Sequence, residues 1–215
     1  MTSLTPFPQF RKMFFERVGS RVAPLGFVGR LREQVFRKET EIGWWSLHLV
    51  FIPRKEYCVV AADVAMRVDA VEDMLLPRVA GQKGQRTRTA TVGAEIGNIA
   101  DGRWHEWYIR PTDDVDAVAD EIVHAFVSFG IPYLERLSDP EALLGALSQD
   151  GPAAVFYNPI PSSRCRRAVA LALLLGHNDR AEAIAAQCRR DLSRQDPANT
   201  RLFEVLAERG IDPPG

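Results

Sequence analysis

Residues 44–68 read WWSLHLVFIPRKEYCVVAADVAMRV, and their pattern predicts the centre of the fold. Apolar residues alternate with other residues over 44–52 and again over 57–68, which is the two-residue period of a β-strand with two distinct faces. The segment between them, Pro53-Arg54-Lys55-Glu56, has the length and polarity of a hairpin loop. The stretch therefore predicts two neighbouring antiparallel strands.

The register of this hairpin follows from its loop. A four-residue loop over 53–56 pairs residue 52 with residue 57, so residue 49 lies opposite residue 60. The apolar residues of both strands then share one face, whereas a shift of one residue would separate them. This apolar face consists of Trp45, Leu47, Leu49 and Phe51 on the first strand and Cys58, Val60, Ala62, Val64 and Met66 on the second.

Periodicity and turn residues predict the remaining elements. The clearest helix spans 113–129, where apolar residues recur at three- and four-residue steps behind three aspartates that favour the helix N-terminus. We predict helices over 6–25, 71–76, 113–129, 139–147, 162–175, 179–194 and 197–209, and further strands over 27–37, 92–99 and 104–110. These elements indicate an α+β fold, an antiparallel sheet of about five strands flanked by helices, with a three-helix C-terminal appendage.

A change in composition predicts a domain boundary. The segment 148–161 contains Gly151, Pro152, Pro159 and Pro161, and the chain beyond it is rich in alanine, leucine and arginine. We therefore expect a sheet domain over 1–150 and a helical segment over 160–215 packed on it. The helical segment is similar to a single tetratricopeptide-type repeat, which needs a neighbour to bury its apolar face.

The N-terminal part also resembles a known bacterial family. The resemblance rests on a first helix followed by Gly26-Phe27, a strand ending in Val35-Phe36-Arg37, two apolar strands, and a helix leading to GIPYLERL over 130–137. In this order the features are similar to the domain-of-unknown-function family numbered 4304, over residues 6–147. The resemblance implies an α+β fold and brings no catalytic residues, because none are established for that family.

Composition places the chain among ordinary globular proteins. The formal net charge is −1, so no global field attracts nucleic acid or an anionic membrane. The first residues lack a secretory signal, and the longest apolar stretch, 168–175, is too short to span a membrane. The three cysteines, Cys58, Cys165 and Cys188, are far apart and odd in number, so we expect a cytoplasmic protein without a disulfide framework.

The sequence carries no motif of an enzyme or of a cofactor site. It lacks a Gly-x-Ser-x-Gly nucleophile elbow, and Gly81-Gln82-Lys83-Gly84 is too short for a phosphate loop. Its four histidines are not spaced as metal ligands. Cys58 lies on the apolar side of its strand, where a thiol stays protonated and inert. We therefore predict no catalytic residues, no metal and no cofactor.

The second face of the predicted sheet is a candidate partner-binding surface. Aromatic residues dominate the energetics of protein interfaces, so an aromatic face favours recognition. The alternative is a second core layer, covered by the C-terminal helices. The candidate residues on this face are Trp44, His48 and Asp63, beside Ser46, with Trp104 and Tyr108 expected to join them.

Two basic clusters are further candidates for charged partners. The loop 77–91 carries four basic residues and no acidic one, and it is either a clamp for phosphate or an acidic partner or a solvated loop. Three arginines at the start of the C-terminal helices oppose the helix dipole, so we expect acidic partners for them in the same chain. These residues are Arg78, Lys83, Arg86 and Arg88 in the loop, and Arg164, Arg166 and Arg167 in the helix.

Together these observations favour a non-catalytic protein-interaction or accessory module of a bacterial cytoplasm, immunity-like in character, with another protein as its partner. The alternative is a phosphate or nucleic-acid binder that uses loop 77–91. A third hypothesis is a hydrolase with its site on the outer sheet face. No membrane association is expected.

Overall fold

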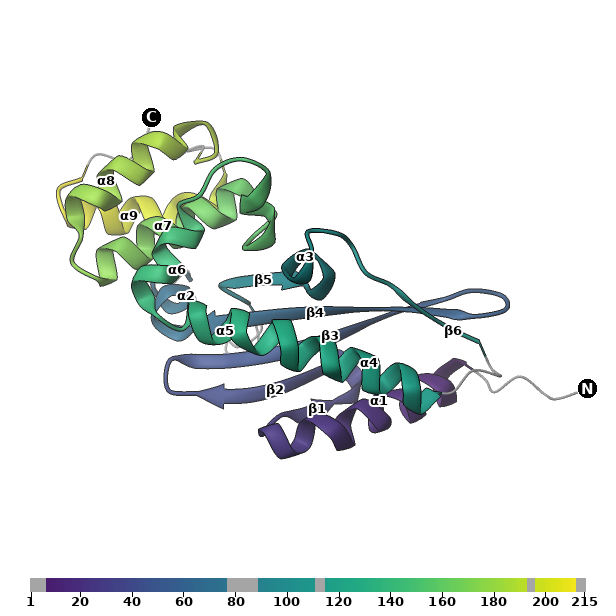
Figure 1. The fold of residues 1–215 in the computed structure, drawn as a ribbon. Coiled ribbons are helices and arrows are strands. Elements are labelled where there is room, and N and C mark those ends of the chain that lie inside the picture. Colours follow the sequence, from purple (N-terminus) through teal and green to yellow (C-terminus); the bar gives the residue numbers. More distant parts are fainter. Residues whose placement is uncertain (1–6, 77–88, 111–114, 193–195, 212–215) are drawn as a thin grey trace, which may run out of the picture. The chain divides into compact units, whose positions relative to one another are not determined.

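The computed structural model describes residues 7–76, 89–110, 115–192 and 196–211 (Figure 1). The fold is α+β, as the sequence predicts. By contacts the chain forms two compact units, Met1–Ala65 with Ala94–Glu135, and Met66–Gly93 with Arg136–Gly215. We call them the first and the second unit and describe each by itself. The predicted division into 1–150 and 160–215 stays a prediction.

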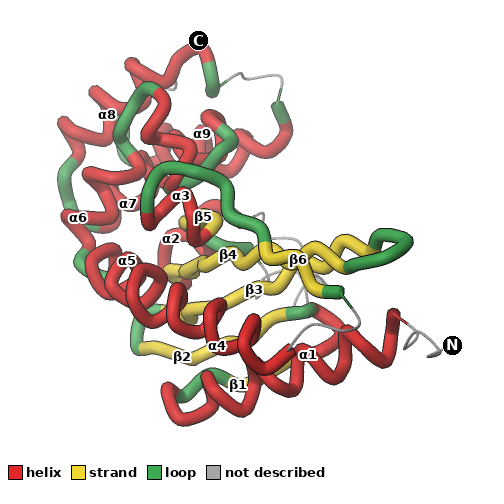
Figure 2. Tube along the Cα trace, turned by 45° about the vertical axis from the view of Figure 1, so that its right-hand side comes forward, coloured by secondary structure: helices red, strands yellow, loops and turns green. Residues whose placement is uncertain are grey.

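The sheet is antiparallel, with the strand order β1-β2-β3-β4-β5, and β6 also pairs with β4. Figure 2 shows these strands in yellow. Their bounds are β1 Val28–Arg30, β2 Val35–Thr40, β3 Gly43–Pro53, β4 Cys58–Val68, β5 Val92–Glu95 and β6 Trp107–Ile109.

The helices follow the predicted order, with several shifted ends. The α-helices are α1 Phe7–Val22, α2 Asp69–Leu75, α3 Ile96–Ala100, α4 Val115–Ala125, α5 Ile131–Leu137, α6 Pro140–Leu147, α7 Pro161–Leu174, α8 Asn178–Gln187 and α9 Thr200–Glu208. The short 3₁₀ and π turns are η1 Ala23–Leu25, η2 Leu31–Glu33, η3 Phe126–Gly130, η4 Pro152–Phe156, η5 Cys188–Arg190 and η6 Pro197–Asn199.

The β3–β4 hairpin has the predicted faces but a register shifted by two residues. The N–H of Arg54 donates to the carbonyl of Tyr57 at 2.8 Å, so residue 54, not residue 52, lies opposite residue 57. Leu49 and Val60 are fully buried, as predicted for the core face. A shift of two leaves every side chain on its predicted face, because the side-chain period of a strand is two.

The predicted single strand over 27–37 is wrong. The chain turns back through η2 and Gln34, whose φ of 56° is left-handed, and forms the two strands of a β1–β2 hairpin. The pattern over these residues is weak because β1 is an exposed edge strand of three residues. Alternation between apolar and polar residues is needed only where one face of a strand is buried, and all three residues of β1 are exposed.

The predicted strand over 92–99 ends early because a side chain caps a helix inside it. The carboxylate of Glu95 accepts the backbone N–H groups of Gly97 at 2.9 Å and Asn98 at 3.1 Å, which starts α3. An N-cap that satisfies these donors favours a helical turn over a strand. The predicted strand over 104–110 is likewise shorter and spans only β6.

The predicted helix over 113–129 continues to Leu137 instead of ending before Gly130. The π-helical turn η3 joins α4 to α5, and a widened turn accommodates Pro132, which cannot donate the usual hydrogen bond. Gly130 fits because it has no Cβ: an added Cβ would lie 2.7 Å from the Phe126 ring and 2.9 Å from Val64. The glycine therefore serves close packing rather than helix termination.

The core of the first unit lies between the sheet and two helices. Helices α1 and α4 run side by side (Figures 1 and 2) and are joined by ion pairs from Arg21 to Asp116 and Asp120. Phenylalanines connect the helices to the rest of the unit: the ring of Phe15 stacks on that of Phe36 at 4.1 Å. These contacts place both helices on the apolar sheet face that the hairpin pattern predicts.

The second unit is built around α7. Helix α7 contacts α2, α6 and α8, and α9 contacts α2. Two of the three arginines at its start have the predicted acidic partners: Arg167 binds Glu72 of α2, and Arg166 pairs with Asp196 at 3.5 Å. Arg164 instead donates to the carbonyl oxygen of Asn158 at 2.8 Å. The expectation of acidic partners is thus confirmed for two of the three arginines.

The expectation of no disulfide is wrong. Cys165 of α7 is bonded to Cys188 of η5, and Cys58 is free and buried. The odd number of cysteines misled the prediction, because one buried free thiol leaves two that can pair. The 23-residue separation is too long for a recognisable local motif, and only the packing of α8 on α7 brings the two residues together.

One helical run, Val115–Leu137, is long and apolar enough to cross a membrane by length and composition alone. A third of the residues in its most apolar part are buried. Ile122 and Phe126 lie fully buried in the first unit, and core helices of globular proteins pass the same test.

Candidate functional site

The structure separates the predicted aromatic residues into buried and exposed ones. Trp44 is only 6% exposed, and the guanidinium of Arg37 lies 4.3 Å above its ring. Trp104 and Tyr108 are 57% and 54% exposed. Trp44 is thus a packed residue of the sheet, whereas Trp104 and Tyr108 are available to a partner.

Trp104 and Tyr108 belong to a compact group that we call the aromatic patch, formed by Tyr57, Trp104, Glu106 and Tyr108. The carboxylate of Glu106 accepts the indole N–H of Trp104 at 3.1 Å and the hydroxyl of Tyr108 at 2.8 Å. The ring centroid of Tyr57 lies 5.7 Å from that of Tyr108. One carboxylate therefore orients the two most exposed aromatic residues of the first unit.

Strand β6 explains why these side chains point outward. Tyr108 pairs with Val59 of β4, and its neighbours Trp107 and Ile109 are buried on the other face. Since strand side chains alternate, anchoring Trp107 and Ile109 in the core turns Tyr108 toward solvent. The ring of His105 covers Trp107, with 4.4 Å between the centroids.

The loop before β6 is fixed by a buried carboxylate. Glu95 accepts the backbone N–H of His105 in addition to those of Gly97 and Asn98. Burial raises the pKa of Glu95, and these backbone hydrogen bonds oppose that rise. Gly97 lies directly under the loop, so Trp104 and Glu106 are held on a tightly packed support.

The electrostatics of the patch combine a bonded carboxylate with exposed charges of both signs. The hydrogen bond to Glu106 raises the pKa of Tyr108, so its hydroxyl remains a donor at neutral pH. Arg54, Lys55 and Arg103 are exposed near the patch, and so are the carboxylates of Glu56 and Asp101. The Asp101 carboxylate accepts the backbone N–H of Arg103 at 3.1 Å. Arg54 is close enough to Tyr108 to oppose that rise in pKa.

His48 and Asp63 face one another across β3 and β4. Nδ1 of His48 lies 3.6 Å from Oδ2 of Asp63, and the two side chains are 42% and 35% exposed. A covalent hydrolase that used this pair would need a side-chain nucleophile beside the histidine. The nearest candidate by sequence, Ser46, is buried and donates instead to the carbonyl of Ala65 at 3.5 Å.

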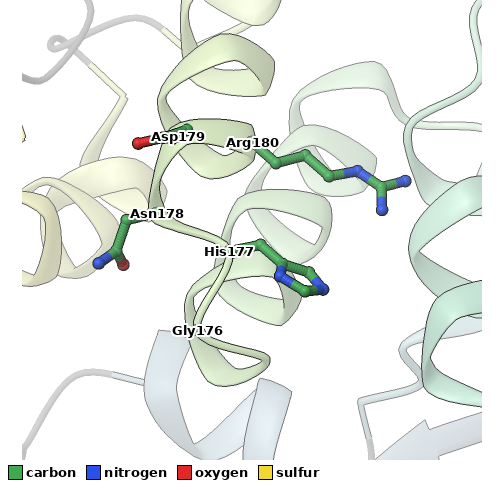
Figure 3. A pocket seen from close by; sticks show the side chains of 5 residues that line it. All are labelled: Gly176, His177, Asn178, Asp179 and Arg180. Carbon is green, nitrogen blue, oxygen red and sulfur yellow. The ribbon is translucent and has the colours of Figure 1, made fainter.

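A shallow depression of about 500 Å³ lies in the second unit at the start of α8 (Figure 3). His177 and Arg180 point to one side of it, and Asn178 and Asp179 point to the other. Nε2 of His177 and Nη1 of Arg180 lie 2.6 Å and 3.0 Å from the carboxylate of Glu141. Both partners lower the pKa of Glu141. These contacts join α6 to the start of α8.

The buried charged side chains Glu72 and Arg67 of the second unit have their hydrogen-bond partners within that unit. Glu72 receives two hydrogen bonds from Arg167, at 2.6 Å and 3.1 Å, and one from the hydroxyl of Thr91. Arg67 is almost fully buried and donates to Asp69, Asp73 and Thr89, at 2.5–3.2 Å. A buried charge with all its partners in place is a structural feature and leaves little for a ligand.

The remaining predicted residues, Arg78, Lys83, Arg86 and Arg88, lie outside the described residues. Across the residues that are described, no group of three or more His, Cys, Asp or Glu side chains is arranged to hold a metal ion.

Sequence reasoning missed Tyr57 and Glu106. A usable signal was present, because residues 104, 106 and 108 share one side of an extended segment by their spacing of two. Tyr57 joins them only through the pairing of β4 with β6.

Comparisons with known proteins identify no relative: no family model, no curated protein and no solved structure matches the chain. The resemblance to the family numbered 4304 therefore stays a prediction.

Proposed function

We propose that this chain is a non-catalytic protein-interaction module that binds a partner protein through the aromatic patch. The observation that carries the proposal is the pair of exposed rings, Trp104 and Tyr108, held by the single carboxylate of Glu106. Tryptophan and tyrosine are the residue types most enriched among those that dominate binding energy.

The fixed geometry of the patch strengthens the proposal. Leaving two large rings in water forgoes the favourable burial of their apolar area. A partner would bury both rings. The two side chains would lose little conformational entropy on binding, because their hydrogen bonds to Glu106 already restrict their rotamers. The site thus supplies binding energy without a rearrangement of the first unit.

A cytoplasmic accessory role remains part of the proposal. The bond between Cys165 and Cys188 is in tension with that location, because cytosolic thiol pools keep most disulfides reduced. Nucleic acid is the competing partner, through loop 77–91 or by stacking of bases on the patch, and such binding weakens steeply with salt.

The test is a selection of partners followed by substitution. Fragments of the source organism's proteome, displayed on phage, are selected on the immobilised full chain, and their affinities are then measured for variants. We expect Trp104→Ala and Tyr108→Ala each to weaken binding by about tenfold or more, the loss typical of a central interface aromatic.

The matched control is Phe129→Ala, because Phe129 is an exposed aromatic residue, 41% accessible, elsewhere in the first unit. This variant should bind like the wild type, and circular dichroism should show all three variants folded. Selected fragments that bind the Trp104 and Tyr108 variants as tightly as the wild type would refute the proposal.

A further inference from the structure

Helices α7 and α8 form a hairpin that the chain joins at one end and a disulfide joins at the other. The connection over residues 175–177 is short, so α8 runs back along α7. Cys165 lies near the start of α7 and Cys188 directly follows α8, with 6.1 Å between their Cα atoms. The bond therefore closes the open end of the hairpin.

Apart from the bond, α8 is held by a small buried surface and by exposed polar contacts. Three residues of α8 are buried, against nine of α7. Glu141 binds the start of α8, and near its end Gln187 is hydrogen-bonded to Asp150. Segments with few buried apolar contacts and exposed hydrogen bonds open locally at a low cost in free energy. The three buried residues of α8 are Ala181, Ile184 and Ala185.

The turn after Cys188 belongs to the same end of the hairpin. The N–H groups of Asp191 and Leu192 donate to the carbonyl of Cys188, at 2.8 Å and 2.9 Å, and Leu192 is fully buried. If Cys188 leaves α7, these residues lose the support that positions them. The part of the chain that the bond holds in place thus includes the end of α8 and the turn through Leu192.

The other helices of the second unit are attached independently of the bond. Helix α7 packs on α2 and α6, and α9 packs on α2. Arg166, next to Cys165, donates to the side-chain oxygen of Asn199 at 2.8 Å, just before α9. Arg209, just after α9, donates to the carbonyl of Leu173 at 3.1 Å. These contacts keep α9 on α7 whether or not the bond is present.

The proposed cytoplasmic location bears on the chemistry of the bond. Disulfides of cytosolic proteins, where they occur, are usually transient bonds that form and break with the redox state. Cys165 and Cys188 are 5% and 8% exposed, so a thiol reaches their sulfurs only when the end of the hairpin opens locally. Opening and reduction therefore favour one another.

Resting on the cytoplasmic role proposed above, we infer that the Cys165–Cys188 bond is a reversible redox latch on the α7–α8 hairpin. The oxidised bond holds the end of α8 on α7. Reduction lets this end open and exposes Ile184 and Ala185, while α7 and α9 stay folded.

The reductant is a small cytosolic thiol of the glutathione class, acting by thiol–disulfide exchange. Its thiolate attacks Sγ of Cys188, which opens with the end of α8. A mixed disulfide forms there, the bond to Cys165 breaks, and the leaving Cys165 thiolate takes up a proton. A second glutathione thiolate attacks the glutathione sulfur of the mixed disulfide, which releases Cys188 as a thiol together with glutathione disulfide. Two electrons and two protons thus pass to the cysteine pair, and glutathione disulfide reverses the steps.

The test is hydrogen exchange of the full chain, with the bond oxidised and in an excess of reduced glutathione. Alkylation in denaturant should label one cysteine of the oxidised protein and three of the reduced one. We expect reduction to speed exchange of the amides over 184–192 at least about tenfold, because the open state is no longer restrained by the bond. The amides over 202–206 in α9 should change less than about twofold, and glutathione disulfide should restore the slow exchange.

Two variants serve as controls. The double variant Cys165→Ser/Cys188→Ser should exchange like the reduced wild type and ignore glutathione. Cys58→Ala should respond like the wild type, because Cys58 lies in the first unit and takes no part in the bond. The reduced wild type carries no substitution, so its exchange decides the question even if the double variant fails to fold.

Three outcomes would overturn the inference. A bond that persists in reduced glutathione is a permanent structural bond, of the kind found in oxidising compartments. Reduction without faster exchange over 184–192 would mean that the bond does not hold α8. Equal acceleration in α9 would mean that the second unit unfolds as a whole. None of these results touches the binding of fragments to the aromatic patch, which tests the proposed function separately.

Discussion

Gly97 lies in α3 beneath the loop that carries Trp104, and a Cβ built there would lie 2.4 Å from the carbonyl oxygen of Arg103. The same atom would lie 2.6 Å from Cβ of His105. Since the nearest obstacle is backbone, it cannot be relieved by a side-chain rotation. We expect Gly97→Ala to lower the free energy of unfolding by about 1–3 kcal/mol, as overpacking does, measured by urea denaturation.

Gly145→Ala is the matched control for this substitution. Gly145 also lies in a helix, α6, but a Cβ there meets no atom within 4 Å. Alanine should therefore stabilise the helix by up to about 1 kcal/mol. The fragments selected on the patch should bind Gly145→Ala normally and Gly97→Ala more weakly, because the loop that holds Trp104 has to move. Equal stability of the two variants would contradict the tight support described for the patch.

At the scale of elements, the disulfide ties α7 to the end of α8. Closing a loop of 23 residues in the unfolded chain removes conformational entropy, so Cys165→Ser should cost about 3 kcal/mol of stability. Dithiothreitol should lower the Tm of the wild type and leave that of Cys165→Ser unchanged. Equal sensitivity of both proteins to the reductant would show that the bond does not stabilise the fold.

A thiol titration checks the same bond. Burial raises the pKa of Cys58 to about 11, so this thiol stays protonated at neutral pH and should react slowly in the folded protein. The unreduced protein in denaturant should show one reactive thiol, and the reduced protein three. Three thiols without reduction would mean that the bond is absent from the isolated protein.

At the scale of the whole molecule, folding should not depend on a metal ion. Within the described residues no cluster of ligands is present, and the ionisable groups that are buried in the second unit are paired with protein partners. A chelator should therefore leave the Tm unchanged, since metal binding is not coupled to folding. A stoichiometric metal that survives dialysis, together with a lower Tm after chelation, would contradict this expectation.

The fold class and the two faces of the central strands could be predicted from local sequence patterns. Leu49 and Val60 are buried and His48 and Asp63 lie opposite them, because strand periodicity is local and survives even a two-residue error in register. The sequence also indicated the charges at the start of α7 that need acidic partners. It could not indicate α3, where one capping carboxylate outweighed an apolar strand pattern.

Which aromatic residues are exposed could not be predicted from the sequence, because it depends on how distant segments pack. Trp44 and Trp104 each begin a predicted strand, but Trp44 is covered by Arg37 while Trp104 projects beside Tyr108. The partners of Cys165 and Arg167 could not be predicted from the sequence either, because they lie 23 and 95 residues away along the chain. Which side chains are exposed, and which distant residues pair, depends on which segments of the chain pack together in the folded protein. A local sequence pattern does not contain this information.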